Sequence, residues 1–249
     1  MLVSHPANAD AAPAAPLLAP IKRRSFLTYA GATALVLAGC QKNDATPGAT
    51  DVGSGDIGVL NLVYAIEQLQ ATFYTKVIAG SYFTSLTAAS AGHQIFSDIA
   101  QHERVHADFW RTSLTTNALK ILNTKLDDQV DFTVSTTATG SGKMGVLNAA
   151  RVLKDLSVAT YNGAARFLTT ADYLTLMSKI VSVEARHAAL IRDLLVAGGD
   201  TSLGTGFAGS DVVDATSRQE KSLPPTNALL QLNTFLATDS QLTATKLIV

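Results

Sequence analysis

Apolar side chains recur at intervals of three and four residues along four long segments of the chain. This spacing places the apolar side chains of each segment on one face of an α-helix. The four helices are expected at about residues 56–79, 85–117, 143–168 and 171–197. Each helix has one face to bury, so the pattern predicts an all-α bundle.

The lengths of the connections predict how these helices pair. The links 80–84 and 169–170 are short, so the first and second helices, and the third and fourth, should be antiparallel neighbours. Residues 118–142 form a long polar connection between the two pairs. The predicted architecture is therefore two antiparallel helix pairs joined by one long crossover.

The four glutamates of the chain are placed unusually, because three of them, Glu67, Glu103 and Glu184, lie on predicted buried faces. A buried carboxylate is costly unless it is paired or binds a metal. Glu103 and Glu184 are each followed three residues later by a histidine, His106 and His187, on the same helix face. A single glutamate and histidine at this spacing usually form a chance ion pair on the surface. Two pairs together with Glu67 match the ligands of dimetal carboxylate bundles, and they suit iron, manganese or zinc.

With these motifs the chain resembles ferritin-like domain proteins of the bacterial desiccation-related and Rds1-like type. The segment LNLVYAIEQLQATFY, with Glu67 and Tyr74, resembles the first helix of that family. The segment ARVLKDLSVATYNGAA, with Tyr161, resembles the third helix, and QVDF near Asp131 resembles the crossover. The resemblance covers about residues 60–195. It implies a ferritin-like four-helix bundle that binds iron or manganese, with Tyr74 and Tyr161 beside the ligands.

Lys154 departs from the family pattern. The third helix usually offers a fourth glutamate seven residues before its tyrosine, and this position is Lys154 here. The next residue, Asp155, is turned by about 100° around the helix axis and cannot take that role. Three carboxylates with one ammonium leave two net negative charges, which would balance one divalent ion. If both histidines are protonated, the same group is neutral and needs no metal, so one bound ion and none both remain open.

The N-terminal residues 1–39 are predicted to be an export signal rather than part of the fold. Arg23 and Arg24 precede an apolar run of about 13 residues, which is too short to span a bilayer. The arginine pair resembles a twin-arginine signal, and LAGC ending at Cys40 resembles a lipobox. An ordinary basic signal and an incidental thiol are the plain alternatives. We expect a lipid on Cys40, a flexible tether over 40–55, and a periplasmic or outer-membrane location.

The C-terminal residues 199–249 are predicted to be an extension that carries a short amphipathic helix at 226–237, packed on the bundle at 56–198. His93 and His102 are expected to face solvent. A net charge of −1 gives no case for nucleic acid binding.

Two functions fit the residues: a metal protein acting in oxidation or metal handling, or a metal-free structural lipoprotein of the stress response. The residues indicate no catalytic group, substrate or oligomeric state.

Overall fold

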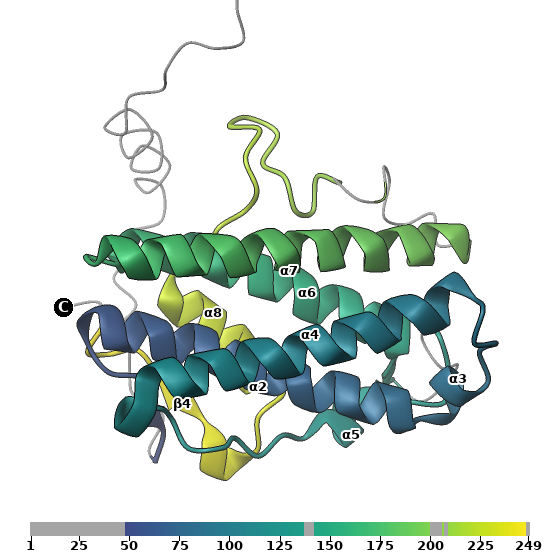
Figure 1. Cartoon of the computed structure of the whole chain (residues 1–249), viewed down its shortest axis with the longest axis horizontal. Coiled ribbons are helices and arrows are strands. Elements are labelled where there is room, and N and C mark those ends of the chain that lie inside the picture. Colours follow the sequence, from purple (N-terminus) through teal and green to yellow (C-terminus); the bar gives the residue numbers. More distant parts are fainter. Residues whose placement is uncertain (1–47, 137–141, 200–205, 207–208, 248–249) are drawn as a thin grey trace, which may run out of the picture. The chain divides into compact units, whose positions relative to one another are not determined.

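The computed structural model describes residues 48–136, 142–199, 206 and 209–247. Its four long helices are α2 (Gly55–Ala79), α4 (Ala91–Leu114), α6 (Val146–Ala164) and α7 (Ala171–Ala197). Helix α2 packs mainly against α4, and α6 packs mainly against α7, each as an antiparallel pair (Figure 1). The predicted all-α bundle of two helix pairs is confirmed.

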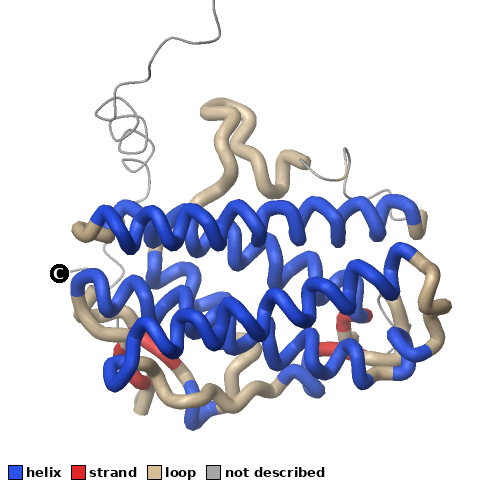
Figure 2. The backbone as a smooth tube through the Cα atoms, in the orientation of Figure 1, coloured by secondary structure: helices blue, strands red, loops and turns tan. Residues whose placement is uncertain are grey.

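The shorter elements lie at the ends and along one side of this bundle. They are β1 (Thr50–Asp51), α3 (Ser81–Thr84), η2 (Thr115–Asn117), α5 (Leu126–Gln129), β2 (Val130–Asp131), β3 (Met144–Gly145), η3 (Ala165–Phe167), α8 (Pro225–Asn233), η5 (Thr238–Ser240) and β4 (Leu242–Thr243). The strands form two short parallel pairs, β1 with β4 and β2 with β3, near opposite ends of the bundle (Figure 2).

Helix α2 is the central helix, because almost every residue from Gly58 to Gln70 is buried. It contacts α4, α6 and α8. A helix buried on all sides rarely carries a charged side chain in its interior. Its one glutamate, Glu67, therefore indicates a partner of opposite charge inside the bundle.

The second helix begins later than expected. The sequence pattern places its start near residue 85, whereas α4 begins at Ala91. The hydroxyl of Ser90 accepts a hydrogen bond from the backbone N–H of His93 and so caps the helix there. Residues 85–90 instead form turns after α3. By contrast, α7 has the predicted bounds and ends before Gly198 and Gly199, the latter with a φ of 93°.

The first part of the crossover is attached to the bundle by side-chain hydrogen bonds. Its amides and carbonyls are bound by two buried side chains of α2. Asn61 donates to the carbonyl of Asn117 and accepts from the N–H of Leu119, while Gln68 accepts from the N–H of Leu122. Further along, β2 pairs in parallel with β3, which leads directly into α6.

The end of the predicted flexible tether belongs to the folded domain. Within 40–55, Thr50 and Asp51 pair with Leu242 and Thr243, and Val52 is buried. Backbone hydrogen bonds fix this segment against the C-terminal strand, which is far away in the sequence. The predicted signal 1–39 and Cys40 lie outside the described residues.

The C-terminal extension covers α6. Its helix α8 packs against α6 and α2, and it ends at Asn233 rather than at the predicted residue 237. The preceding covering segment, residues 209–223, approaches α6 at Gly163, where a Cβ atom would lie only 1.7 Å from the carbonyl oxygen of Leu223. No helix in the described part of the chain is both long and apolar enough to span a bilayer.

Candidate metal centre

The four long helices each contribute an ionisable side chain to one buried cluster in the middle of the bundle. The cluster contains Glu67 from α2, Glu103 and His106 from α4, Lys154 from α6, and Glu184 and His187 from α7. The side chains of the three glutamates and of Lys154 are 0% exposed. The structure therefore brings together all the residues that the sequence singled out as ligands, and it places Lys154 among them.

Lys154 forms the shortest contacts between opposite charges in this cluster. Its Nζ lies 2.5 Å from Oε1 of Glu103 and 2.8 Å from Oε2 of Glu184. The ammonium thus bridges α4 of the first helix pair and α7 of the second. It is fully desolvated, so its charge is offset by neighbouring protein groups, chiefly these carboxylates.

The two histidines line the less enclosed side of the cluster. Nδ1 of His106 lies 3.1 Å from Oε1 of Glu184 and 3.6 Å from Oε2 of Glu67. Nδ1 of His187 lies 3.0 Å from Oε1 of Glu103 and 3.6 Å from Oε1 of Glu184. Their side chains are 11% and 5% exposed, so solvent reaches the cluster from the imidazole side.

Several of these buried atoms have no well-aligned hydrogen bond within the described residues, although all of them except Oε2 of Glu103 form ion-pair contacts. They are Oε2 of Glu67, both carboxylate oxygens of Glu103, Nδ1 of His106, Oε1 of Glu184 and Nδ1 of His187. Buried polar atoms without a hydrogen bond are rare in folded proteins, and a bound ion is one explanation for them. Ligand atoms of Glu67, Glu103, His106 and Glu184 all lie within 4.8 Å of one another, a set that could hold a metal ion. His187 stands at the edge of this set.

Aromatic and amide side chains hold the carboxylates in place. Tyr161 donates its hydroxyl proton to Oε1 of Glu67 at 2.5 Å and accepts the indole N–H of Trp110 at 2.9 Å. The amide of Gln70 donates to Oε2 of Glu184 at 3.3 Å.

Tyr74 lies beside the cluster, as the resemblance implies, but contacts it differently from Tyr161. Its hydroxyl is buried without a hydrogen bond in the described part of the chain, while Nζ of Lys154 lies 5.3 Å from the centre of its ring. Tyr74 therefore contacts the cluster through its aromatic face, where a cation is attracted to the ring.

The pKa values of the cluster show how its charges compensate in the metal-free state. Burial, together with the negative charges of Glu184 and Glu103, raises the pKa of Glu67 to about 8. Burial alone would lower the pKa of His106, but its contacts with Glu184 and Glu67 outweigh burial and raise that pKa to about 10.

The same balance between burial and neighbouring charges sets the pKa values of Glu184 and Lys154. Burial opposes ionisation of Glu184, but Lys154 and the two histidines hold its pKa well below the ordinary value. Burial also disfavours the charged form of Lys154, but the neighbouring glutamates keep its pKa above the ordinary value. In the metal-free state the charged forms of Lys154, His106 and Glu184 are therefore favoured, beside a Glu67 whose protonated form is favoured.

His102 is a member of the site that sequence reasoning missed. It is exposed, as predicted, but its Nδ1 lies 2.9 Å from Nε2 of His187. Burial and the proximity of His187 and His106 lower the pKa of His102, which favours its neutral form. The spacing of four residues between His102 and His106 is the signal that could have placed it on this side of α4. His93, also expected in solvent, is half-buried and stacks on Phe83 at 4.5 Å.

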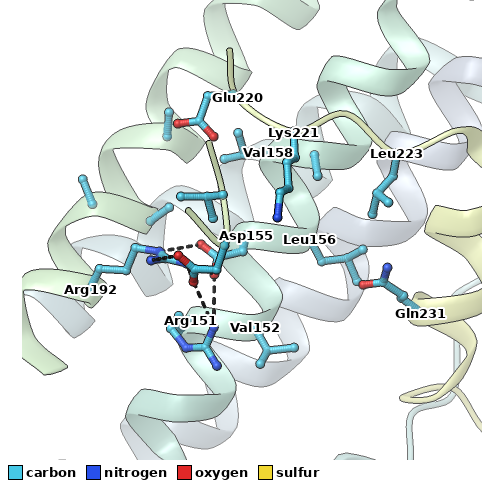
Figure 3. A pocket seen from close by; sticks show the side chains of 16 residues that line it. Arg151, Val152, Asp155, Leu156, Val158, Arg192, Glu220, Lys221, Leu223 and Gln231 are labelled. Carbon is cyan, nitrogen blue, oxygen red and sulfur yellow. Dashed lines mark hydrogen bonds and ion pairs between the residues drawn. The ribbon is translucent and has the colours of Figure 1, made fainter. Parts of the chain in front are cut away.

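Asp155 faces away from the cluster, as its position on the helix predicts. It binds Arg192, whose Nε and Nη2 lie 3.0 and 2.7 Å from its two oxygens, and Arg192 also binds Asp211 of the covering segment (Figure 3). These side chains border a pocket of about 300 Å³ between α6, α7 and the covering segment, which Glu220 and Lys221 also line. The arginine clamp thus attaches the C-terminal extension to the bundle, and the only glutamate outside the buried cluster lies in this separate pocket.

Comparison with known proteins agrees with the helical architecture. A model of the ferritin-like domain family matches residues 55–197, which extend from the first residue of α2 to the last residue of α7. A search of the curated proteins finds no match.

Proposed function

The chain belongs to the ferritin-like domain family, and from this premise we propose that its bundle binds a single divalent ion, iron or manganese, at a centre that Lys154 has reduced from two ions to one. Glu67, Glu103, His106 and Glu184 would hold the ion, with His187 as a further donor at the edge. The ammonium of Lys154 would supply the positive charge that a second ion supplies elsewhere in such centres.

The observation that carries this proposal is the convergence of buried ligand atoms that have no aligned hydrogen bond. A centre built only for ion pairing would direct each N–H at an oxygen. Here the Nδ1 atoms of His106 and His187 lie close to carboxylate oxygens without that alignment. Ligand atoms of four side chains that lie within 4.8 Å of one another without that alignment suit a cation better than they suit a network of hydrogen bonds.

Iron or manganese bound in this way would supply redox or Lewis-acid chemistry toward dioxygen or a peroxide. The chain's own residues have simpler tasks. Tyr161 orients Glu67, Gln70 orients Glu184, and burial of the three carboxylates excludes water from all sides except that of the histidines. This chemistry would fit a protein that limits oxidative or desiccation stress.

Metal analysis of the purified protein tests the proposal. Protein made with iron and manganese in excess should carry close to one ion per chain, whereas Glu184→Gln, which keeps the shape but removes the charge, should carry almost none. Lys154→Glu should raise the content toward two, because it replaces the ammonium with a ligand. Wild-type protein that contains no metal under these conditions would refute the proposal.

A metal-free structural role is the second candidate, and the bridging contacts of Lys154 favour it. If both histidines are protonated, their charges and that of Lys154 balance the three carboxylates without any ion. On this alternative, Lys154→Glu would simply destabilise the bundle and would create no metal binding. The response of that one variant therefore separates the two functions.

We further propose that the protein is exported by the twin-arginine route and anchored by a lipid on Cys40, on the periplasmic side of a membrane or in the outer membrane. The export of folded cargo would allow the metal to be inserted beforehand. Cys40→Ser should move the protein from the membrane fraction to the soluble fraction. Equal membrane association of the variant would refute the anchor.

A further inference from the structure

His102 connects the buried cluster with the surface. It directly precedes Glu103 on α4, and it is exposed while Glu103 is buried. Its Nδ1 lies 2.9 Å from Nε2 of His187 on α7, with the two ring planes inclined by only 25°. One turn of α4 therefore contacts the cluster twice, through a carboxylate inside and through an imidazole at its edge.

The two nitrogens of His187 have different surroundings. Nε2 faces outward and has a hydrogen-bond partner in His102, whereas Nδ1 faces inward, 3.0 Å from Oε1 of Glu103, without an aligned hydrogen bond in the described residues. A neutral imidazole carries its proton on one nitrogen and a lone pair on the other. The contact between the histidines needs one donor and one acceptor, so the proton assignment of both rings is linked.

Two assignments are available. If His102 donates, the proton of a neutral His187 must lie on Nδ1, where it would be buried without an aligned acceptor. If His187 donates, its inward Nδ1 carries a lone pair, and the remaining N–H of His102 is its Nε2–H on the exposed ring. The second assignment leaves no buried N–H unsatisfied. It sets the Nδ1 lone pair 3.0 Å from Oε1 of Glu103, a contact between two acceptors that a cation between them would make favourable.

We infer that His102 is a positioning residue, whose Nδ1 accepts the Nε2–H of His187 and so holds the Nδ1 lone pair of His187 toward the metal centre. This inference rests on the proposed function, because a lone pair directed among carboxylates is useful only for a cation. Metal-binding histidines commonly donate their other N–H to an acceptor that fixes the ring. Here a second imidazole, supplied by the residue next to a ligand, does this across the gap between two helices.

Two substitutions of His102 distinguish the effect of losing its hydrogen-bond acceptor from the effect of losing its volume. His102→Asn places an amide oxygen close to the position of Nδ1, at the same number of bonds from the backbone, and keeps an acceptor. His102→Leu fills similar space without one. His93→Leu is the matched control, because His93 lies on the same helix but contacts Phe83 and not the cluster.

The first measurement is the tautomer of His187 in metal-free protein at neutral pH, read from the nitrogen shifts of its ring by NMR. Wild type and His102→Asn should carry the proton on Nε2, and His102→Leu should lose this preference. A proton on Nδ1 in the wild type would overturn the inference. This readout needs no bound metal, so a failure of the inference can be told apart from a failure of the proposed function.

The second measurement is the affinity for Co²⁺, followed by its visible absorption. His102→Leu should bind about 10–100-fold more weakly than wild type, the usual loss when the partner of a ligand histidine is removed. His102→Asn and His93→Leu should remain close to wild type. Equal affinity of His102→Leu and wild type would overturn the inference, whereas absence of Co²⁺ binding by the wild type would count against the proposed function alone.

Discussion

Replacement of Lys154 by methionine should destabilise the metal-free protein strongly, because it removes the cation that bridges two buried carboxylates. Methionine has nearly the same length and no charge, so packing changes little. At an effective dielectric constant of about 20, the contacts of Nζ at 2.5 and 2.8 Å each correspond to about 6–7 kcal/mol of Coulomb attraction. Two effects reduce the net loss of stability. Methionine avoids the cost of desolvating the ammonium, which is several kcal/mol, and a carboxylate can take up a proton and lose its charge.

The expected net loss is about 3–5 kcal/mol, the range found when one partner of a buried ion pair is removed. Urea unfolding at neutral pH with a chelator present measures it. With a slope near 2 kcal/mol per molar, the midpoint should fall by about 2 M. Addition of Mn²⁺ should restore part of the loss, since a metal ion can replace the ammonium.

Lys179→Met is the control for this experiment. Lys179 lies on α7 and is exposed, so its replacement should change the free energy of unfolding by no more than about 0.5 kcal/mol. If Lys154→Met unfolds at the same urea concentration as Lys179→Met, the ammonium does not compensate the carboxylates, and the reasoning is refuted.

Three further predictions concern the surroundings of the centre. The metal-free protein should melt at progressively lower temperature as the pH rises from about 4.5 to 10. The folded pKa values of Glu67 and His106, about 8 and 10, lie above their ordinary values of 4.5 and 6.5, so these protons are held more tightly in the folded state. Calorimetry in a chelator should show this slope, with a smaller slope in His106→Gln; a constant melting temperature would contradict it. Tyr161→Phe should cost about 1–3 kcal/mol in urea unfolding, because it leaves buried partners of the hydroxyl unsatisfied, and an unchanged midpoint would show that this hydroxyl contributes nothing. Arg192→Leu should speed limited proteolysis within the covering segment while the circular dichroism of the bundle is retained, and equal cleavage of variant and wild type would exclude the clamp.

The helical elements were predictable to a large extent because their signals are local. The bounds of α7 follow from apolar periodicity and a pair of terminal glycines, and both depend on neighbours within a few residues. The start of α4 was wrong by about six residues, because apolar side chains continue before the helix, whereas the N-cap at Ser90 fixes where it begins. The attachment of residues 117–122 to the bundle could not be predicted, because the amides of Asn61 and Gln68 that bind them belong to a helix far away in the sequence.

The candidate site was predictable in its residues but not in its contacts. Buried faces can be assigned from spacing, so Glu67, Glu103 and Glu184 could be placed inside the bundle, and Lys154 with them. The contact of His102 with His187 could not be assigned in this way. This contact depends on the distance between α4 and α7. Residue spacing gives the direction of a side chain on its own helix but says nothing about the position of a side chain on another helix.

The sequence by itself determined which side chains enter the interior, because the period of the α-helix converts residue spacing directly into a direction. Only the tertiary structure decided which atoms meet there: that one ammonium contacts two carboxylates, that several ligand atoms lack an aligned hydrogen bond, and that an exposed imidazole reaches a buried one. These contacts depend on the separation and rotation of whole helices, which many weak packing interactions set together and no single motif encodes.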